Sequence, residues 1–481
     1  MRNLSDSVFP LPQGSLLPVW QWSWSTTGPS LCCWSAKRIQ LCDGPVVRPA
    51  GPAWVSSLFQ NERELFNPAL AASTRERRRL ALSLLNAGVA AVDPARCTGA
   101  GIARLKGMGL AEGRHTHLFS LGKAALAMAQ QALADLELQG GIVHCFRSGR
   151  LGPLLLERCG HPLPASEAAE QGQRVLQLAR SLGPDDDALV LLSGGASAML
   201  EAPVAGLSIA DLQLTTRLLL ACGADIGEVN AVRRVLSQTK GGGLLAALHP
   251  ARVFNVILSD VPGQPASVVA SGPSLPPGPG NARVVVERYG LADRLPPLVL
   301  QRILSGAGES WEQPADLRLH SVVAADNDSA VAAVVARGQE LGVKVLVLGE
   351  GVFGEARTAG PQFLSRARAL DSDAVIAGGE CTVRLRGMGR GGRAQEFALA
   401  ALLELQQGDG LVAAFGTDGL DGNSDAAGAI ADAAVLDLCS MGAARGHLDD
   451  NDSASLFAGC GAQLITGRTG TNVSDLYLYV R

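Results

Sequence analysis

Several familiar sequence signals are missing from the chain of 481 residues, and each absence narrows its function. The ten cysteines and seven histidines form no CxxC or HExxH pattern, so we expect buried free thiols and no zinc site. No apolar run approaches the roughly 20 residues of a membrane span, which argues against a membrane protein. The N-terminus also lacks a basic segment leading into an apolar one, so we expect no secretory signal and a cytoplasmic location.

An excess of charge of one sign is lacking too. The chain has 41 basic and 45 acidic residues, a net charge of −4, and the two signs are mixed along it. Such a chain is not expected to bind nucleic acid or an anionic membrane. Lysine is scarce, at five of the 41 basic residues, so a lysine within a motif is a candidate for a site that needs a compact ammonium.

The usual nucleotide-binding motifs are absent, but glycine-rich segments are present. There is no GxxxxGK[ST], and no GxGxxG follows a predicted strand, which argues against a P-loop protein and an ordinary dinucleotide site. Glycine-rich segments occur at residues 193–197, 241–243, 387–392 and 466–471. Backbone N–H groups in such turns can hold a phosphate because no side chain blocks its approach. Each segment alone is more typical of a tight turn, but the four together favour a phosphorylated ligand.

From about residue 69 onward, short apolar runs alternate with helical segments. Examples are the runs at 116–120, 188–192, 253–258 and 320–325, which are typical of a parallel sheet covered on both faces. We predict an α/β fold with a larger Rossmann-like domain at 69–355 and a smaller C-terminal α/β domain at 371–481. Glycines and polar residues follow the runs, so a ligand is expected at the carboxyl ends of the strands.

Residues 1–65 differ from the rest of the chain. They contain five of the six tryptophans and show no helical or strand period. Three interpretations fit this composition: an incorrectly assigned translation start, a disordered extension or a targeting segment.

Candidate charged residues lie where the predicted strands end. Phosphoryl transfer needs cations to neutralise the moving charge and carboxylates to hold Mg²⁺ or position the nucleophile. The cationic candidates are Lys123, Arg233, Lys240 and Arg393. The acidic candidates are Asp260, Glu380, Asp418, Asp421 and Asp425. A turn or a helix cap explains any single acid equally well, so the division of roles among them stays open.

Ten motifs in succession resemble glycerate 2-kinases of the MOFRL type. They include GKAALAMA (122–129), LLSGGASAML (191–200), GRGGRAQEFAL (389–399) and TGRTGTNVSDL (466–476). The resemblance extends from about residue 70 to the C-terminus. It implies ATP-dependent phosphorylation of D-glycerate to 2-phosphoglycerate, with Mg²⁺ as cofactor and the active site in the cleft between the two domains.

The resemblance and the residue pattern together assign roles to individual side chains. The expected catalytic residues are Lys123, Arg393 and Asp260. The residues expected to bind ligand are Ser193, Gly194, Gly195, Ser197, Lys240, Glu380, Asp418 and Asn472. The candidates for a metal site are Asp260, Asp418 and Asp421. The sequence does not fix the oligomeric state, and a homodimer is left open.

Four positions depart from the usual family pattern. Ala394 replaces an Asn, Cys381 a Thr, Gln264 an Asp, and Arg468 stands where Pro is common. Ala394 and Gln264 remove polar groups near the expected site. We therefore keep as alternatives a hydroxypyruvate reductase, which the missing GxGxxG disfavours, a non-catalytic nucleotide-binding homologue, and a kinase for a related hydroxy acid.

Overall fold

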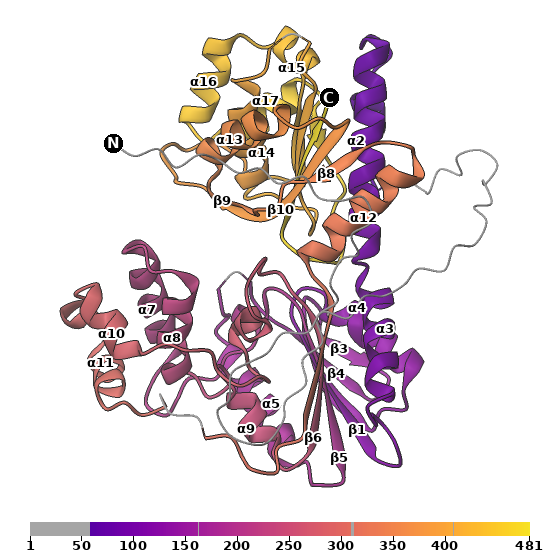
Figure 1. Cartoon of the computed structure of the whole chain (residues 1–481). Helices are drawn as coiled ribbons and strands as arrows, with labels where there is room; N and C mark the ends of the chain where they lie inside the picture. The colour runs from indigo at the N-terminus through magenta and orange to yellow at the C-terminus, as the bar shows by residue number, and fades with distance from the viewer. Residues whose placement is uncertain (1–57, 162, 309–311, 407) are drawn as a thin grey trace, which may run out of the picture. The chain divides into compact units, whose positions relative to one another are not determined.

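The computed structural model describes residues 58–481 apart from residues 162, 309–311 and 407. The interpretations of residues 1–57 therefore lie outside the described residues. Two seven-stranded sheets with their helices make up the described part of the chain (Figure 1). Within that part, no helix is both long and apolar enough to cross a bilayer.

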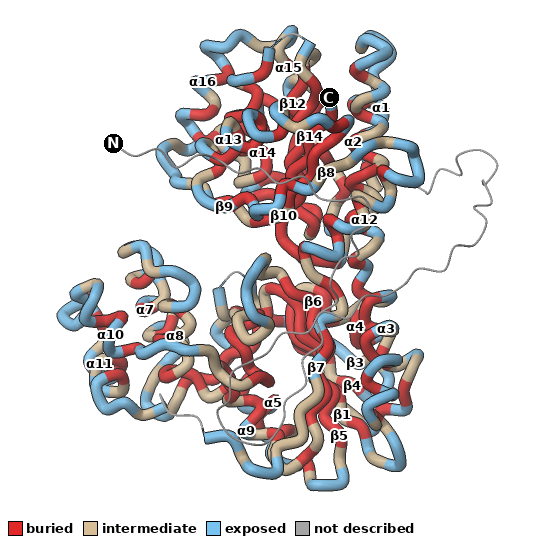
Figure 2. The backbone as a smooth tube through the Cα atoms, in the orientation of Figure 1, coloured by how far each residue is buried: buried red, intermediate tan, exposed pale blue. Residues whose placement is uncertain are grey.

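The first sheet is parallel except at one edge. Its strand order is β3-β4-β2-β1-β5-β6-β7, and only β3 runs antiparallel to its neighbour. The strands are β1 (His115–Leu121), β2 (Gly140–Cys145), β3 (Gly149–Leu151), β4 (Leu154–Arg158), β5 (Asp186–Leu192), β6 (Arg252–Leu258) and β7 (Leu319–Ala325). Figure 2 shows buried residues along its central strands. The predicted α/β fold with a Rossmann-like parallel sheet is confirmed.

Helices cover both faces of this sheet, which explains the continuous apolar runs. Alternate side chains point to opposite faces of a strand. On β5, Leu189 and Leu191 belong to the hydrophobic cluster that includes α3 (Pro94–Lys106) and α4 (Ala125–Asp135). Val190 and Leu192 belong to the cluster on the other face, with α5 (Ala168–Arg180) and α9 (Gly243–Leu248). The strand is therefore apolar at every position from Ala188 to Leu192.

The direction in which strands are added reverses between β1 and β5. From β1 the chain builds through β2 to β4, and then returns to β5 on the other side of β1 before continuing to β6 and β7. At such a switch point the loops after the two strands diverge and leave room for a ligand. The loops here begin at residues 122 and 193, so the topology brings two of the predicted ligand-binding segments together.

The second sheet is mixed, with the order β13-β12-β11-β14-β10-β8 and with β9 also paired to β10. The strands are β8 (Val345–Val347), β9 (Val352–Glu355), β10 (Ala374–Thr382), β11 (Leu411–Gly416), β12 (Gly428–Ala431), β13 (Gln463–Leu464) and β14 (Asp475–Val480). β14 lies between β10 and β11 and is antiparallel to both. The change from one sheet to the other falls between β7 and β8, before the predicted boundary. The division into domains itself stays a prediction.

The remaining helices connect the strands or extend from the sheets. They are α1 (Glu62–Leu65), α2 (Ala72–Ala91), α6 (Ala196–Met199), α7 (Ile209–Ala221), α8 (Ile226–Leu236), α10 (Ala282–Arg288), α11 (Pro297–Leu304), α12 (Asn327–Glu340), α13 (Ala356–Arg368), α14 (Arg393–Leu402), α15 (Ala433–Leu438), α16 (Met441–Asp449) and α17 (Ser453–Gly459). Residues 58–65, which we assigned to the atypical segment, belong to the folded core. Leu65 is buried, and the Phe59 ring meets the Phe415 ring edge-on at 5.8 Å between centroids.

A buried ion pair ties α2 to the second sheet. Arg78 on α2 donates from Nε to Asp432 Oδ2 at 2.7 Å and from Nη2 to Asp432 Oδ1 at 3.1 Å. The two side chains are only 1% and 4% exposed. Asp432 follows β12 and also accepts a hydrogen bond from the Val435 N–H, which caps α15. The pair therefore fixes the first long helix against the end of a strand more than 300 residues later.

We expect Arg78→Ala to lower the free energy of unfolding by about 3–5 kcal/mol, because it leaves the Asp432 carboxylate buried without its partner. Urea denaturation followed by circular dichroism measures the change. The exposed pair of Lys344 and Asp371 supplies the control, since Lys344→Ala should cost no more than about 1 kcal/mol. Equal effects of the two substitutions would show that the buried pair has no special role.

Candidate functional site

The loops after β1 and β5 are hydrogen-bonded to each other at the switch point. Gly122 has a φ of +119°, and a Cβ there would lie 2.4 Å from the Ser193 carbonyl oxygen, so this position requires glycine. The backbone N–H of Lys123 donates to the Gly194 carbonyl at 2.9 Å. The backbone N–H of Ala124 donates to Ser193 Oγ at 3.1 Å. These bonds place Lys123 between the end of β1 and the start of α4.

The Lys123 ammonium is paired with Asp418. The distance from Nζ to Oδ2 is 2.9 Å, and the side chains are 19% and 20% exposed. Asp418 follows β11, so the pair joins the carboxyl ends of one strand from each sheet. The other Asp418 oxygen accepts a hydrogen bond from the Leu420 N–H at 3.2 Å, which holds the carboxylate in place. Both charges remain partly open to a ligand.

Asp260 lies beside this pair, after β6. Its Oδ2 accepts from Asn472 Nδ2 at 3.3 Å, and its carbonyl accepts from Ser474 Oγ at 2.6 Å. A Cβ on Gly194 would lie 2.1 Å from Asp260 Oδ2, so a glycine there lets the carboxylate approach the loop. Burial raises the pKa of Asp260 to about 6, although the positive charges of Lys123 and Arg393 oppose the shift.

Arg393 opens α14 and is held by two acids. Its Nε and Nη2 donate to the Asp475 carboxylate at 2.6 and 3.0 Å, and its Nη1 lies 2.7 Å from Glu380 Oε1. Burial disfavours the guanidinium charge, but the Asp475 carboxylate outweighs it and raises the pKa of Arg393. Burial also raises the pKa of Glu380, to about 7. Part of the Glu380 side chain nevertheless remains exposed. Arg393 is thus a permanent charge in a fixed orientation.

The four glycine-rich segments differ in the hydrogen-bond donors they have to offer. In segment 387–392 the N–H groups of Met388, Arg390 and Gly391 donate to side-chain oxygens of the protein at 2.8–3.0 Å. In segment 241–243 the backbone N–H groups donate to carbonyls, for instance Gly241 to Ser271. These two segments have little left for a phosphate, and the expectation of a phosphate cradle there is not met.

The other two segments keep N–H donors that the described residues leave open. Among the described residues, the N–H groups of Gly194, Gly195 and Gly470 have no protein acceptor. A Cβ on Gly195 would lie 2.9 Å from Lys123 Cγ, which shows how closely this loop passes the lysine. N–H groups next to an ammonium form a suitable environment for a phosphate.

Lys240 is engaged within the protein and holds the residues that follow the loop after β5. It is buried and donates from Nζ to the carbonyls of Ser197 and Leu200 at 2.7 and 3.1 Å, and it lies 3.3 Å from Glu201 Oε2. Burial lowers the pKa of Lys240 to about 8. Because an ammonium has three donors, none is left for a ligand. Arg233 makes a similar contact with the Ser197 carbonyl, at 2.8 Å.

Asp421 caps α14 and does not face the site with free oxygens. Its carboxylate accepts from the N–H groups of Ala394 and Gln395 at 3.0 and 2.8 Å, and from Gln395 Nε2 at 3.1 Å. This makes it a poor metal ligand, in contrast to our expectation. Among the described residues, no three His, Cys, Asp or Glu side chains converge as a cation site.

The structure brings together several of the expected residues: Lys123, Asp260, Asp418, Asn472 and the loop after β5. Glu380 and Arg393, which are paired with each other, lie next to this group, and Ser474 contacts both Asp260 and Glu380. Ser474 Oγ lies 3.4 Å from Glu380 Oε2. Asp475 and Ser474 were not predicted as site residues from the sequence. One signal was available for Asp475, since an acid at the start of a strand buried on both faces needs a cationic partner.

Comparison with known proteins identifies the family of the chain. The family model of a domain of unknown function, DUF4147, matches residues 80–304, and the MOFRL family model matches residues 373–475. A D-glycerate 2-kinase of Thermotoga maritima is 35% identical over 381 residues, which cover 75% of this chain and 89% of that protein. A relative in Agrobacterium vitis, provisionally named a hydroxypyruvate reductase, is 36% identical over 379 residues, which cover 74% of this chain and 96% of the relative.

A solved structure of a glycerate kinase has a similar fold. The crystal structure of a glycerate kinase from Thermotoga maritima superposes with a TM-score of 0.73 at 32% identity, covering 84% of this chain and 98% of that one. The chain matches both the DUF4147 and the MOFRL family models and belongs to the glycerate kinase family.

Proposed function

We propose that the chain transfers the γ-phosphoryl group of ATP to D-glycerate and forms 2-phosphoglycerate. The observation that carries the proposal is the Lys123–Asp418 ion pair at the switch point, beside the open N–H groups of Gly194 and Gly195. A cation next to fixed N–H donors is what a transferring phosphoryl group needs for stabilisation. Relatives named glycerate kinases support the choice of substrate.

Different charged residues have different roles in the proposed reaction. Lys123 and Arg393 stabilise the transferring phosphoryl group, and the remaining guanidinium N–H groups of Arg393 are partly exposed for this purpose. Asp260 accepts the proton of the 2-hydroxyl group as that oxygen attacks phosphorus. A carboxylate with a pKa raised to about 6 suits this role, because a general base acts best near the working pH.

Mg²⁺ fits the acidic side of the same site. Asp418 is a partly exposed oxygen ligand at the mouth of the loop, whereas Asp421 is occupied by backbone N–H groups. Mg²⁺ is commonly bound by one or two carboxylates together with substrate phosphates. We therefore assign Asp418 to the ion, with ATP supplying further ligands. When bound, the ion neutralises charge on the phosphates.

The full chain incubated with ATP, Mg²⁺ and D-glycerate should form 2-phosphoglycerate, identified by ³¹P NMR. Chelation with EDTA should stop the reaction, and added Mg²⁺ should restore it. Oxidation of NADH in the presence of hydroxypyruvate would instead identify a reductase. Binding of ATP without a phosphorylated product from any hydroxy acid would support the non-catalytic alternative.

Lys123→Met and Arg393→Lys should each lower kcat by about a hundredfold or more, because each removes fixed charge or hydrogen-bond donors from the transition state. Lys123→Met is the cleaner test, since its partner Asp418 is partly exposed and should tolerate the loss. Lys344→Met, at an exposed site, is the matched control. If kcat stayed near that of the wild type in a folded Lys123→Met protein, the assignment of Lys123 would be wrong.

The pH dependence follows from Asp260. Since the base must be deprotonated, kcat/KM should fall about tenfold per pH unit as pH drops below about 6. Asp260→Asn should lower kcat by about a hundredfold or more and abolish this acid limb, whereas the exposed control Asp371→Asn should keep it. Retention of the acid limb in Asp260→Asn would assign it to another group.

A further inference from the structure

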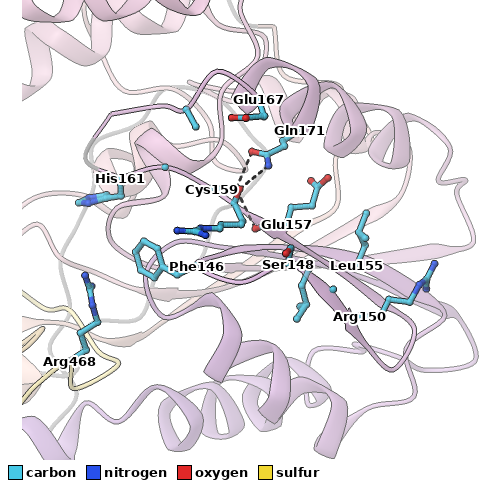
Figure 3. Close-up of a pocket in the computed structure, with 15 residues that line it drawn as sticks. Phe146, Ser148, Arg150, Leu155, Glu157, Cys159, His161, Glu167, Gln171 and Arg468 are labelled. Atoms are coloured by element: carbon cyan, nitrogen blue, oxygen red, sulfur yellow. Dashed lines mark hydrogen bonds between the residues drawn. The ribbon is translucent and has the colours of Figure 1, made fainter.

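A large pocket lies along β3 and β4 and reaches past the carboxyl ends of β2 and β4. It has a volume of about 1010 Å³, and the residues that line it include Phe146, His161, Gln171 and Arg468 (Figure 3). Phe146 follows β2 and His161 follows β4, whereas Arg468 belongs to the glycine-rich segment 466–471. This volume is at the upper end of the range for sites of drug-sized ligands. It is far larger than a three-carbon acid requires.

The pocket adjoins the loop with open N–H groups. A Cβ built on Gly195 would lie 3.0 Å from His161 Cδ2 and 2.9 Å from Lys123 Cγ, so these two side chains flank the same glycine. His161 lines the pocket, and Lys123 belongs to the catalytic cluster. A ligand in the pocket can therefore extend a phosphate chain to Gly194 and Gly195.

Flat side chains gather at this end of the pocket. Arg468 lies over the Phe146 ring, with 5.2 Å between the guanidinium carbon and the ring centroid. Phe146 is 38% exposed, so part of its ring is open to a ligand. Figure 3 shows Phe146, His161 and Arg468 at one end of the pocket and Arg150 at the other. Aromatic rings and guanidinium planes are the surfaces on which nucleobases stack.

Polar groups deeper in the pocket are already bonded within the protein. Glu157 accepts from Arg174 Nε at 2.6 Å and shares a hydrogen bond of 3.0 Å with His144 Nε2. Gln171 donates to the Arg158 carbonyl at 2.9 Å and accepts from Cys159 Sγ at 3.3 Å. These two groups are therefore engaged within the protein, whereas Phe146 and Arg468 present flat surfaces to the pocket, which Arg150 and Arg158 also line.

We propose that this pocket holds the base and ribose of the nucleoside triphosphate, with Phe146 and Arg468 as the stacking surface. The inference rests on the proposed kinase function. It assigns the nucleotide and glycerate, the two substrates, to two separate parts of the site. The nucleotide occupies the side of Lys123 that adjoins His161, and glycerate occupies the side that adjoins Asp260 and Arg393.

Direct binding tests this proposal independently of turnover. Calorimetric titration of the full chain with ADP should show that Phe146→Ala and Arg468→Ala each weaken binding by roughly ten- to a hundredfold. Arg468→Lys keeps the charge but loses the flat guanidinium, so it should weaken ADP binding nearly as much as Arg468→Ala. Arg366→Ala, at an exposed ion pair on α13, is the control and should bind ADP like the wild type.

Steady-state kinetics then separate the two substrates. In the Phe146 and Arg468 variants, KM for ATP should rise while KM for D-glycerate stays the same. Unchanged ADP affinity, or a rise confined to KM for D-glycerate, would overturn the pocket assignment. A wild-type protein that binds ADP but phosphorylates no glycerate would refute the proposed function alone, because the binding data would still decide the pocket. A wild-type protein that does not bind ADP would refute both.

Discussion

The ion pair between Lys123 and Asp418 is the contact on which the site depends. It joins the loop after β1 to the loop after β11, so that strand ends from two different sheets meet at one place. The hydrogen bonds from Asn472 and Ser474 to Asp260 also join the two sheets, because Asp260 follows β6 and the two donors directly precede β14. A partly exposed pair adds little to stability. Its importance lies in fixing where the positive and negative charges stand.

Two acids in and around the second sheet hold other groups in place. Asp475 orients Arg393, and Asp421 caps the helix that Arg393 begins. Arg233 on α8 and Lys240 in the loop before α9 donate to the carbonyl of Ser197 and hold it in place. The groups left for chemistry are few. They are those whose donors or acceptors the protein does not itself use.

The fold could be predicted well from sequence because buried parallel strands leave continuous apolar runs between helices. The residues around Lys123 and Asp260 could be predicted from motifs that end such runs. Sequence could not tell a glycine turn with open N–H groups from one whose N–H groups are engaged, as in segment 387–392, because the acceptors lie about 30 to 60 residues away. It also could not show that Lys240 is fully bonded, since Ser197 and Leu200 approach it only in the folded chain.

The same segment, 387–392, has a kinetic consequence. Met388 is 95% exposed, yet the surrounding N–H groups are held by Asp450, Asp452 and Asn423. The loop is therefore restrained by hydrogen bonds and by the close approach of its glycines to neighbouring residues, and Arg393 directly follows it. Little conformational entropy remains for this side chain to lose when a substrate arrives. The ordering takes place once, during folding, and is not repeated in each turnover.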